Sequence, residues 1–591
     1  MNKPSFRVKF LIWRRNHISD SQFLMILSVL VGITSGLAAV VVKKSVHAIQ
    51  SFLTRGFDVE LGNYLYMLYP TIGILLVVII IRYFLRKPVG DGIPNVLYAI
   101  SKNSSIIKPY QMYASVITSS LTVGFGGSVG LEGPTVSTGG AIGSNIGRML
   151  NLDYRGLTLL VAAASAGAMS AIFKSPIAAI IFALEVLMLD LTMTALIPLL
   201  IASISAALVS YMFLGQDFIY SFRVQGIFEL TDIPYYIALG ILTGFVSLYF
   251  TRMYFSITNR FDKLNSWWLK ILVGAAILGV LIYFLPVLYG EGYDVVSNSL
   301  HGNFTYIFNN SIFYDYRNNV VAIMLMLIAM VFFKSVATSV TFGAGGIGGI
   351  FAPTLFLGAN TGLFFAELID FTHIGSVEPS SFALVGMAGL IAGVIHAPLT
   401  AIFLIAELTG GYGLFVPLMI VSTISYTTIT YFEKTSIYTR QLARRGELFT
   451  HNKDKMVISL MNVKELLETE FLPVDKNGTL GDLVKVIKKS KRNVFPVIDK
   501  EYNFYGVVHL NNIREVIFKP ELYDEVKVTN LMNEPMAMAH MDDSMEQIVE
   551  KFQKTPHYNL VVLDEGKYVG FVSRAKVFSK YRNLLKKFSS D

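Results

Sequence analysis

Long uncharged apolar runs recur through the first 450 residues of the chain. The first, Phe23–Val42, exceeds the apolar core of a signal peptide and lacks a small-residue cleavage site, so we expect a retained helix. The others are Tyr64–Ile81, Leu191–Gln216, Tyr235–Phe250, Ile271–Gly290 and Pro417–Tyr431. Runs of this length suit the roughly 30 Å hydrocarbon layer of a bilayer. The pattern predicts an all-α polytopic membrane domain.

Charge is distributed differently after residue 450. The last 141 residues hold 42 of the 90 charged side chains, so a soluble tail follows the membrane domain. Lys3, Arg7, Lys9, Arg14 and Arg15 precede the first apolar run, which predicts a cytoplasmic N-terminus. The tail has no export signal, so we expect it on the same side, with an even number of crossings between.

Composition excludes several classes. With 53% apolar and 15% charged residues, the chain is not a secreted, fibrous or disordered protein. The net charge of +8 lies in loops and ends rather than on one basic face, which excludes nucleic acid as a partner. The absence of cysteine excludes disulfides, thiol catalysis and cysteine-ligated metal. No paired-aspartate, HExxH or cofactor-loop motif is present, so we expect neither an enzyme nor a metal centre.

Two apolar segments are interrupted by glycine and proline. Val123–Gly147 carries nine glycines in 25 residues, and Thr341–Gly358 reads TFGAGGIGGIFAPTLFLG. Such segments suit broken helices that end inside the membrane against protein or a water-filled cavity. Close helix packing through glycine is the alternative.

The segments belong to an internal repeat. GLEGPTVSTGGAIG (130–143) matches GIFAPTLFLGANTG (349–362), and SPIAAIIFALEV (175–186) matches APLTAIFLIAEL (397–408). The offsets are 219 and 222 residues, which indicates a duplicated half. Glycine- and proline-interrupted segments at corresponding places of a repeat point to a transporter or channel site near the bilayer midplane.

Three short motifs and one tyrosine carry a family resemblance. They are Gly90-Asp91-Gly92-Ile93-Pro94, Gly130-Leu131-Glu132-Gly133-Pro134, Gly349-Ile350-Phe351-Ala352-Pro353, and Tyr438 in SIYTRQLARRG. In this order they resemble the CLC family of chloride channels and proton-coupled chloride exchangers. The resemblance implies an inverted-repeat helical membrane domain with broken helices, over residues 21–447, after a cytoplasmic segment at 1–20.

Helix N-termini can bind an anion without a buried cationic side chain. They expose unpaired N–H groups and a partial positive charge of about half a unit. The resemblance implies that the anion contacts the Ile350 and Phe351 amides, the Asp91–Gly92 turn and the Tyr438 hydroxyl. An interfacial anchor is the alternative role for Tyr438.

Glu132 is the expected gate. A carboxylate in an apolar, glycine-rich segment costs a few kcal/mol and is functional by default. The resemblance implies that ionised Glu132 occupies the anion path, and that protonated Glu132 leaves it and carries the proton.

The chain departs from the family pattern at three places. Leu131 replaces a basic residue, and Asp91 replaces the serine of chloride-selective members, which leaves the preferred anion open. Val186 stands where exchangers often have a second glutamate. Glu185 and Glu407 occupy matching places in the repeat, and we expect a common packing or helix-end role for them.

The tail resembles two CBS modules, at 456–519 and 528–588, after a linker at 448–455. The expected strands include NVFPVID, YGVVHL, YNLVVLD and YVGFVS. Nucleotide binding by the pair is possible in the family. Here His509 and Asn512, then Ser573 and Lys576, replace the usual ribose-binding pattern, so a structural role is favoured. No partner histidine or cysteine is near His509, so we expect a surface or interdomain residue rather than a metal ligand.

These observations favour a homodimeric transporter of chloride or a similar anion, in a bacterial inner membrane with both termini cytoplasmic. Each subunit has one path, gated by Glu132 and coupled to protons. An anion channel is the alternative that Val186 favours. A cation transporter using Asp91, Glu132, Glu185 and Glu407 is more remote, as is a non-transporting sensor.

Overall fold

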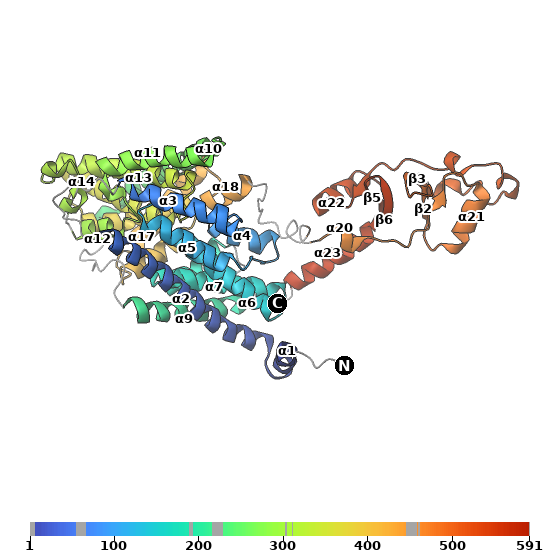
Figure 1. Cartoon of the computed structure of the whole chain (residues 1–591), viewed down its shortest axis with the longest axis horizontal. Helices are drawn as coiled ribbons and strands as arrows, with labels where there is room; N and C mark the ends of the chain where they lie inside the picture. The colour runs from blue at the N-terminus through green and yellow to red at the C-terminus, as the bar shows by residue number, and fades with distance from the viewer. Residues whose placement is uncertain are drawn as a thin grey trace. The chain divides into compact units, whose positions relative to one another are not determined.

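A computed structural model describes residues 6–54, 67–90, 92–187, 193–215, 229–301, 304–309, 311–444, 458 and 461–589. It divides into a membrane unit, Met1–Leu448, and a tail unit, Phe449–Asp591 (Figure 1). Within the described residues, eight helices are long and apolar enough to cross a membrane. The predicted linker at 448–455 and Asp91 both lie outside the described residues.

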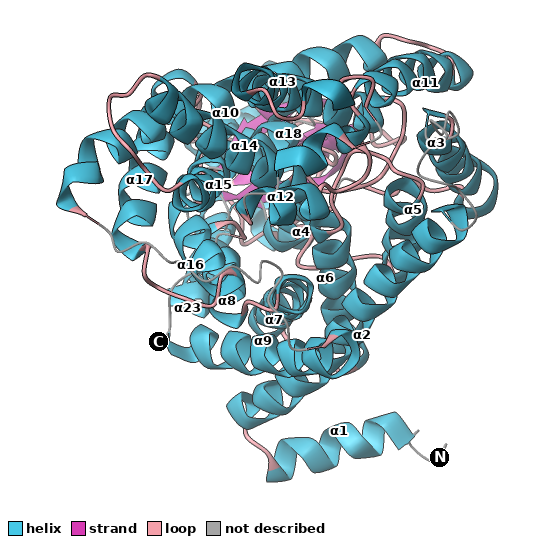
Figure 2. Cartoon of the chain, turned by 90° about the vertical axis from the view of Figure 1, so that its left-hand side faces the viewer, coloured by secondary structure: helices cyan, strands magenta, loops and turns pink. Residues whose placement is uncertain are grey.

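The membrane unit is a packing of helices (Figure 2). Its first half comprises α1 (Phe6–His17), α2 (Asp20–Thr54), α3 (Tyr69–Ile79) continued by the π-helix η2 (Ile80–Leu85), α4 (Ile93–Lys102), α5 (Gln111–Gly124), α6 (Glu132–Met149), α7 (Tyr154–Phe173), α8 (Pro176–Glu185) and α9 (Met193–Leu214). The second half comprises α10 (Ile233–Asp262), α11 (Trp267–Phe284), α12 (Tyr293–Leu300), α13 (Val320–Gly343), α14 (Phe351–Phe371), α15 (Pro379–Ile395), α16 (Pro398–Leu408) and α17 (Phe415–Phe432). Helix α18 (Ile437–Arg444) follows the two halves, and short 3₁₀ turns fill several connections.

The two halves repeat the same packing. Helix α6 packs on α7 as α14 packs on α15, and α2 packs on α7 and α9 as α10 packs on α15 and α17. Helix α5 contacts α2 and α6 as α13 contacts α10 and α14. The duplication predicted from the sequence is therefore a duplication of architecture.

The glycine-rich segments combine both of the roles considered for them. Residues 125–131 separate α5 from α6 and residues 344–350 separate α13 from α14, so each segment does interrupt the helices. Glycines further along α6 and α14 then allow close packing. A Cβ at Gly143 would stand 2.6 Å from the Leu160 carbonyl oxygen of α7, and one at Gly358 would stand 2.5 Å from Met387 Cα of α15.

Helices α8 and α16 cap each other. The Glu407 carboxylate, at the end of α16, accepts from the Ile177 and Ala178 amides of α8 at 3.1 and 2.8 Å. The Glu185 carboxylate, at the end of α8, accepts from the Leu399 and Thr400 amides of α16 at the same two distances. Each acid fills the anion-attracting N-terminus of the other helix. The predicted helix-end role of this pair is confirmed.

The tail unit contains two similar modules. Its first sheet has the order β1 (Val474–Asp475), β2 (Val494–Ile498), β3 (Phe504–His509), and its second β4 (Met538–His540), β5 (Asn559–Asp564), β6 (Lys567–Ser573). In both, the first pair is parallel and the second antiparallel. The helices are α20 (Val463–Leu466), α21 (Leu480–Lys489), α22 (Met545–Gln553) and α23 (Arg574–Ser589). All four strands predicted from the sequence are present.

Removing either capping acid will destabilise the membrane unit. Glu185→Ala leaves two amides and the Thr400 hydroxyl of α16 without their acceptor, and Glu407→Ala does the same to two amides of α8. We expect a loss of about 1–3 kcal/mol in each case, measured as a lower temperature of aggregation for detergent-purified protein. Asp315→Asn, at an exposed carboxylate in a 3₁₀ turn, is the control and should leave that temperature unchanged.

Candidate functional site

The two halves meet through a pair of backbone hydrogen bonds. The Gly130 amide donates to the Gly349 carbonyl at 2.8 Å, and the Gly349 amide donates to the Gly130 carbonyl at 2.6 Å. Gly130 precedes α6 by two residues, and Gly349 precedes α14 by two residues. This antiparallel bridge therefore brings the beginnings of two equivalent helices together inside the protein.

The beginning of α4 joins the same point. A Cβ at Gly92 would stand 2.6 Å from the Gly133 carbonyl carbon, and one at Gly349 would stand 2.8 Å from the Gly133 amide nitrogen. Gly92 has φ +76° and caps α4, with Pro94 in the first turn. Glycine is required at Gly92 because only a residue without Cβ allows both this backbone conformation and this approach. Three helix N-termini converge here, and their unpaired amides create a site for negative charge.

Glu132 places its carboxylate in this site. The side chain is fully buried, although Glu132 is the first residue of α6. Its Oε1 accepts from the Tyr293 hydroxyl at 2.6 Å, and the carboxylate lies beside the Ala352 amide of α14. Its Oε2 has no hydrogen-bond partner among the described residues. A negative group of the protein thus occupies the position that the helix ends make favourable for an anion.

Tyr438 approaches the site from α18, which packs on α4 and α15. The side chain is 5% exposed, and its hydroxyl has no hydrogen-bond partner among the described residues. The Glu132 carboxylate is close enough to act on this hydroxyl electrostatically. A buried hydroxyl without a partner is costly unless a ligand or water completes it. That cost favours a ligand role over an interfacial anchor.

The GIFAP residues line the same junction. Ile350 caps α14 and Phe351 is its first residue, and both side chains are buried. The Phe351 ring packs against Phe173 and Phe182, with centroids 5.8 and 6.0 Å apart. The side chains of Ile350 and Phe351 are therefore fixed in the core, and the amides are what this turn offers to a ligand.

Two cavities are lined by residues that neighbour the junction in sequence. One of about 880 Å³ is lined by Leu131 and Tyr293 next to Glu132, together with residues of α2 and α12. Another of about 930 Å³ is lined by Gln441, one turn after Tyr438 on α18, and by Arg82, Arg86 and Lys87. Neither cavity is lined by Glu132 or Tyr438, so both adjoin the buried site through neighbouring residues.

Several site residues were not predicted from the sequence. Tyr293 holds Glu132, Glu291 accepts from the Leu131 amide at 3.2 Å, and Lys334 donates to the Gly290 carbonyl at 2.7 Å. Lys334 is fully buried in α13, and its position as the one charged residue of that helix was an available signal. Glu291 and Tyr293, in the run YGEGY, gave no comparable signal.

The tail places His509 between its two modules, as one of the two expected positions has it, but the premise that no partner histidine is near was wrong. The His509 ring stacks on His557, with centroids 4.5 Å apart and planes 15° from parallel, so a second histidine does lie nearby. His509 ends β3 of the first module and His557 precedes β5 of the second, so the two rings meet only in the fold. No group of three or more potential metal ligands occurs among the described residues.

In the second module, the two positions that bind ribose in nucleotide-binding CBS domains, Ser573 and Lys576, already have protein partners. The Ser573 hydroxyl donates to Glu468, and Lys576 Nζ donates to the Leu467 carbonyl at 3.0 Å. In the first module, Asn512 is exposed. These contacts favour a structural role over nucleotide binding.

A duplicated helical membrane unit whose broken helices meet at a buried anion-attracting junction defines an ion-transport protein. The family model for the voltage gated chloride channel matches residues 73–430, and that for the CBS domain matches 463–519 and 528–583. The chain therefore belongs to the voltage-gated chloride channel family, the CLC family, and carries two CBS domains. It is an anion-transport protein of a transporter and channel family rather than of an enzyme family.

Relatives and solved structures agree with this membership. The H(+)/Cl(-) exchange transporter ClcA of Vibrio cholerae is 29% identical over 419 residues, which are 67% of this chain and 84% of the relative. A slow cyanobacterial Cl−/H+ antiporter matches with a TM-score of 0.62 and 23% identity over 71% of this chain and 97% of its own. A eukaryotic CLC transporter matches with a TM-score of 0.60 and 19% identity over 97% of this chain and 99% of its own.

Gly92→Ala will disrupt the junction. The added Cβ would meet the Gly133 backbone, and the backbone at φ +76° and ψ −112° alone costs a residue with a Cβ about 1–3 kcal/mol. We expect a lower aggregation temperature and loss of anion flux in liposomes. Gly411→Ala is the matched control, because no heavy atom lies within 4 Å of a Cβ at that position. Equal behaviour of the two variants would contradict the close approach.

The histidine stack makes the tail sensitive to acid. Burial, and then the neighbouring His557, lower the pKa of His509 below its ordinary value of 6.5. The unfolded chain therefore binds the proton more tightly, so stability is lost as pH falls through 6.5 toward the folded pKa. We expect the tail of full-length protein to resist proteolysis less at about pH 5.5 than at about pH 7.5, at matched protease activity, and His509→Gln to reduce that difference. His540→Gln, at an exposed histidine, should not reduce it.

Proposed function

We propose that this protein exchanges chloride or a related small anion for protons, with Glu132 as the gate and proton carrier. The observation that carries the proposal is the position of the Glu132 carboxylate, buried where the N-termini of α6 and α14 meet. The exchange activity in the name of the Vibrio cholerae relative supports proton coupling.

Glu132 performs both tasks because one carboxylate cannot be charged and protonated together. Ionised, it satisfies the helix N-termini and keeps an anion out of the site. Protonated, it loses most of its attraction to the helix ends, and a free anion competes successfully for the same amides. Anion entry and proton binding are then linked, which is the requirement for exchange.

The anion is held by backbone and hydroxyl groups rather than by a cation. The Ile350 and Phe351 amides, the turn at Asp91 and Gly92, and the unpartnered Tyr438 hydroxyl form the set. An ionised Asp91 would repel an anion, so we propose that Asp91 is neutral, is directed away from the path, or gives the site a selectivity other than the usual one. In each case we expect Asp91 to give this protein an anion preference that differs from that of family members with serine at this position.

The two cavities form the mouths of the path. Helix α2 runs from Asp20 to Lys43 over about 35 Å at 1.5 Å per residue, which is enough to cross the membrane. The cavity beside Lys43 is then outer if the N-terminus is cytoplasmic. Helix α3 and η2 return toward Arg82 and Arg86, whose charges favour the cytoplasmic side.

One chain contains every residue of the proposed set, so each subunit has its own path, and the family favours a homodimer. We place the protein in the inner membrane of a bacterium, with both termini cytoplasmic. The domain limits proposed are those expected from the sequence, and the CBS pair acts as a structural and coupling unit.

A passive anion channel is the second candidate. Val186 is buried at the end of α8, so the place where exchangers often have a second acid is apolar. A cation transporter is less well supported, since Glu185 and Glu407 are occupied as helix caps.

Glu132→Gln will separate anion movement from proton movement. The amide cannot bind or release the proton and no longer competes as an anion. In liposomes holding purified protein, we expect a chloride gradient to drive protons uphill through wild type. We expect the variant to leak chloride with no proton movement.

Glu367→Gln, a half-buried carboxylate later in α14, is the control and should behave as wild type. Chloride flux without proton movement in wild type would establish the channel instead. No chloride flux in wild type would require the assay to be repeated with nitrate, fluoride and bromide.

A further inference from the structure

A second carboxylate lies next to the gate. Glu291 belongs to the loop between α11 and α12, and its Oε1 accepts from the amide of Leu131, the residue before Glu132. Two residues on, the Tyr293 hydroxyl donates to Glu132 itself at 2.6 Å. One short segment therefore brings an acid and a hydroxyl to consecutive residues at the start of α6.

The segment is held firmly in place. The Gly290 amide donates to the Gly126 carbonyl at 3.1 Å, and Lys334 Nζ donates to the Gly290 carbonyl at 2.7 Å. Gly292 has φ +89°, and a Cβ there would stand 2.5 Å from the Phe356 ring. The position of Glu291 is thus set by both halves of the membrane unit rather than by a free loop.

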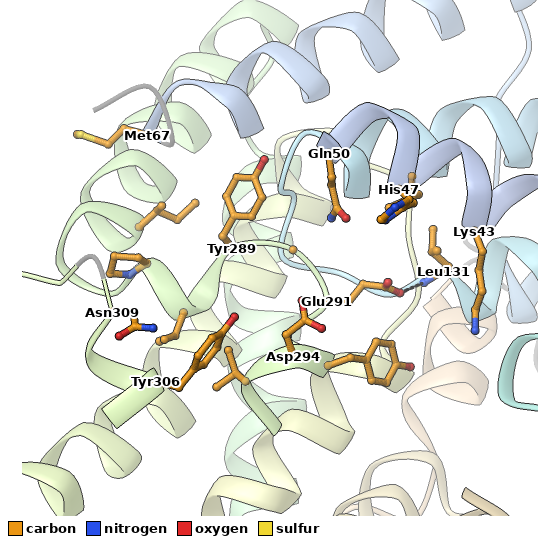
Figure 3. A pocket seen from close by; sticks show the side chains of 18 of the residues that line it. Lys43, His47, Gln50, Met67, Leu131, Tyr289, Glu291, Asp294, Tyr306 and Asn309 are labelled. Carbon is orange, nitrogen blue, oxygen red and sulfur yellow. Dashed lines mark hydrogen bonds between the residues drawn. The ribbon is translucent and has the colours of Figure 1, made fainter. Parts of the chain in front are cut away.

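Glu291 faces the cavity, whereas Glu132 does not. Glu291 and Tyr293 are half-buried and line the 880 Å³ cavity, and Glu132 is fully buried behind them. Figure 3 shows the Glu291 carboxylate directed at Leu131, with Lys43 and His47 on the α2 side and Asp294 on the α12 side. Water in the cavity can reach Glu291 without passing the gate.

Charged groups from three helices act on Glu291. Glu132 from α6, Lys43 from α2 and Lys334 from α13 all act on it electrostatically. Neither lysine forms an ion pair with it among the described residues, since Lys43 donates to the Ile172 carbonyl and Lys334 to Gly290. Other titratable side chains lining the cavity are Lys44, His47, Tyr283, Tyr289, Asp294 and Tyr306.

The charges of Glu132 and Glu291, when both are ionised, equal in number those of Lys43 and Lys334. An anion entering the junction adds one negative charge in a region of low dielectric, where it strongly favours uptake of one proton by the acids. Leu131 leaves uncharged a motif position that is basic in the family, whereas Lys43 and Lys334 act electrostatically on the neighbouring Glu291. The positive charge absent from that motif is therefore supplied by α2 and α13.

We propose that Glu291 is a second proton-transfer residue, which exchanges the proton between Glu132 and water in the cavity. In one direction the Glu132 carboxylic acid loses its proton and the Glu291 carboxylate gains it. The Glu291 acid then releases the proton to cavity water, which restores the carboxylate. This inference rests on the proposed exchange function and adds a residue to it.

The test compares Glu291→Gln with Glu291→Ala by paired chloride and proton flux in liposomes. Glutamine keeps an acceptor for the Leu131 amide but cannot carry a proton, whereas alanine loses both roles. We expect Glu291→Gln to lower proton flux by about tenfold or more, because a positioned acid–base group contributes at least that much. Asp294→Asn, a carboxylate of the same cavity, is the control and should match wild type.

The double variant Glu132→Gln/Glu291→Gln distinguishes a role of Glu291 in proton transfer from a structural role in the anion path. The chloride leak of Glu132→Gln should persist unchanged when Glu291→Gln is added, since no proton step remains to be blocked. Loss of the chloride leak in the double variant would overturn the proposal. A proton flux in Glu291→Gln equal to that of wild type would also overturn it, even if Glu291→Ala were impaired. Absence of coupled flux in wild type would instead contradict the proposed function itself.

Discussion

The hydrogen-bond pair between Gly130 and Gly349 is the constraint on which the site depends. It fixes the beginnings of α6 and α14 within one backbone contact of each other, and the approach of Gly92 to Gly133 adds the beginning of α4. No side chain can occupy the space between these backbones. The glycines are therefore required by the distance between helices, and the prolines begin helices where an amide needs no partner. Separating the two strands of this bridge by even the size of a methyl group would disperse the amides that attract an anion.

The junction obtains its charge from peptide groups, and lysines remain at its margin. Lys334 and Lys43 donate to carbonyl oxygens, so part of their hydrogen-bonding capacity is used by the fold. An ammonium placed directly in the site would bind an anion tightly and release it slowly. Helix ends with about half a charge each bind more weakly, which suits an ion that has to leave again. Ionised Glu132 can fill such a site for the same reason, because it competes with partial charges only.

The sequence was sufficient for the features that are written in local pattern or in the repeat. Interrupted helices, the duplicated halves, the two CBS modules and the helix-end role of Glu185 and Glu407 all follow from spacing and residue type. Contacts between segments that are distant in the chain could not be predicted from the sequence. Tyr293 lies 161 positions from Glu132, and His557 is far from His509 in sequence, so neither partner could be recognised before the fold brought them together. Glu291 depends on two left-handed glycines that orient its loop, Gly290 and Gly292, and these resemble ordinary turn residues in the sequence.

The reciprocal caps of α8 and α16 also constrain how the protein is made. Helix α8 has no acceptor for its first amides until Glu407 has been synthesised, more than 220 residues after Ile177. At 5–20 residues per second this takes about 10–40 s, which is long compared with helix formation. During that time the first half stays in the bilayer with an open helix end and an uncompensated Glu185. The first half therefore cannot complete its packing before the second half is made, because α16 of the second half supplies the cap of α8.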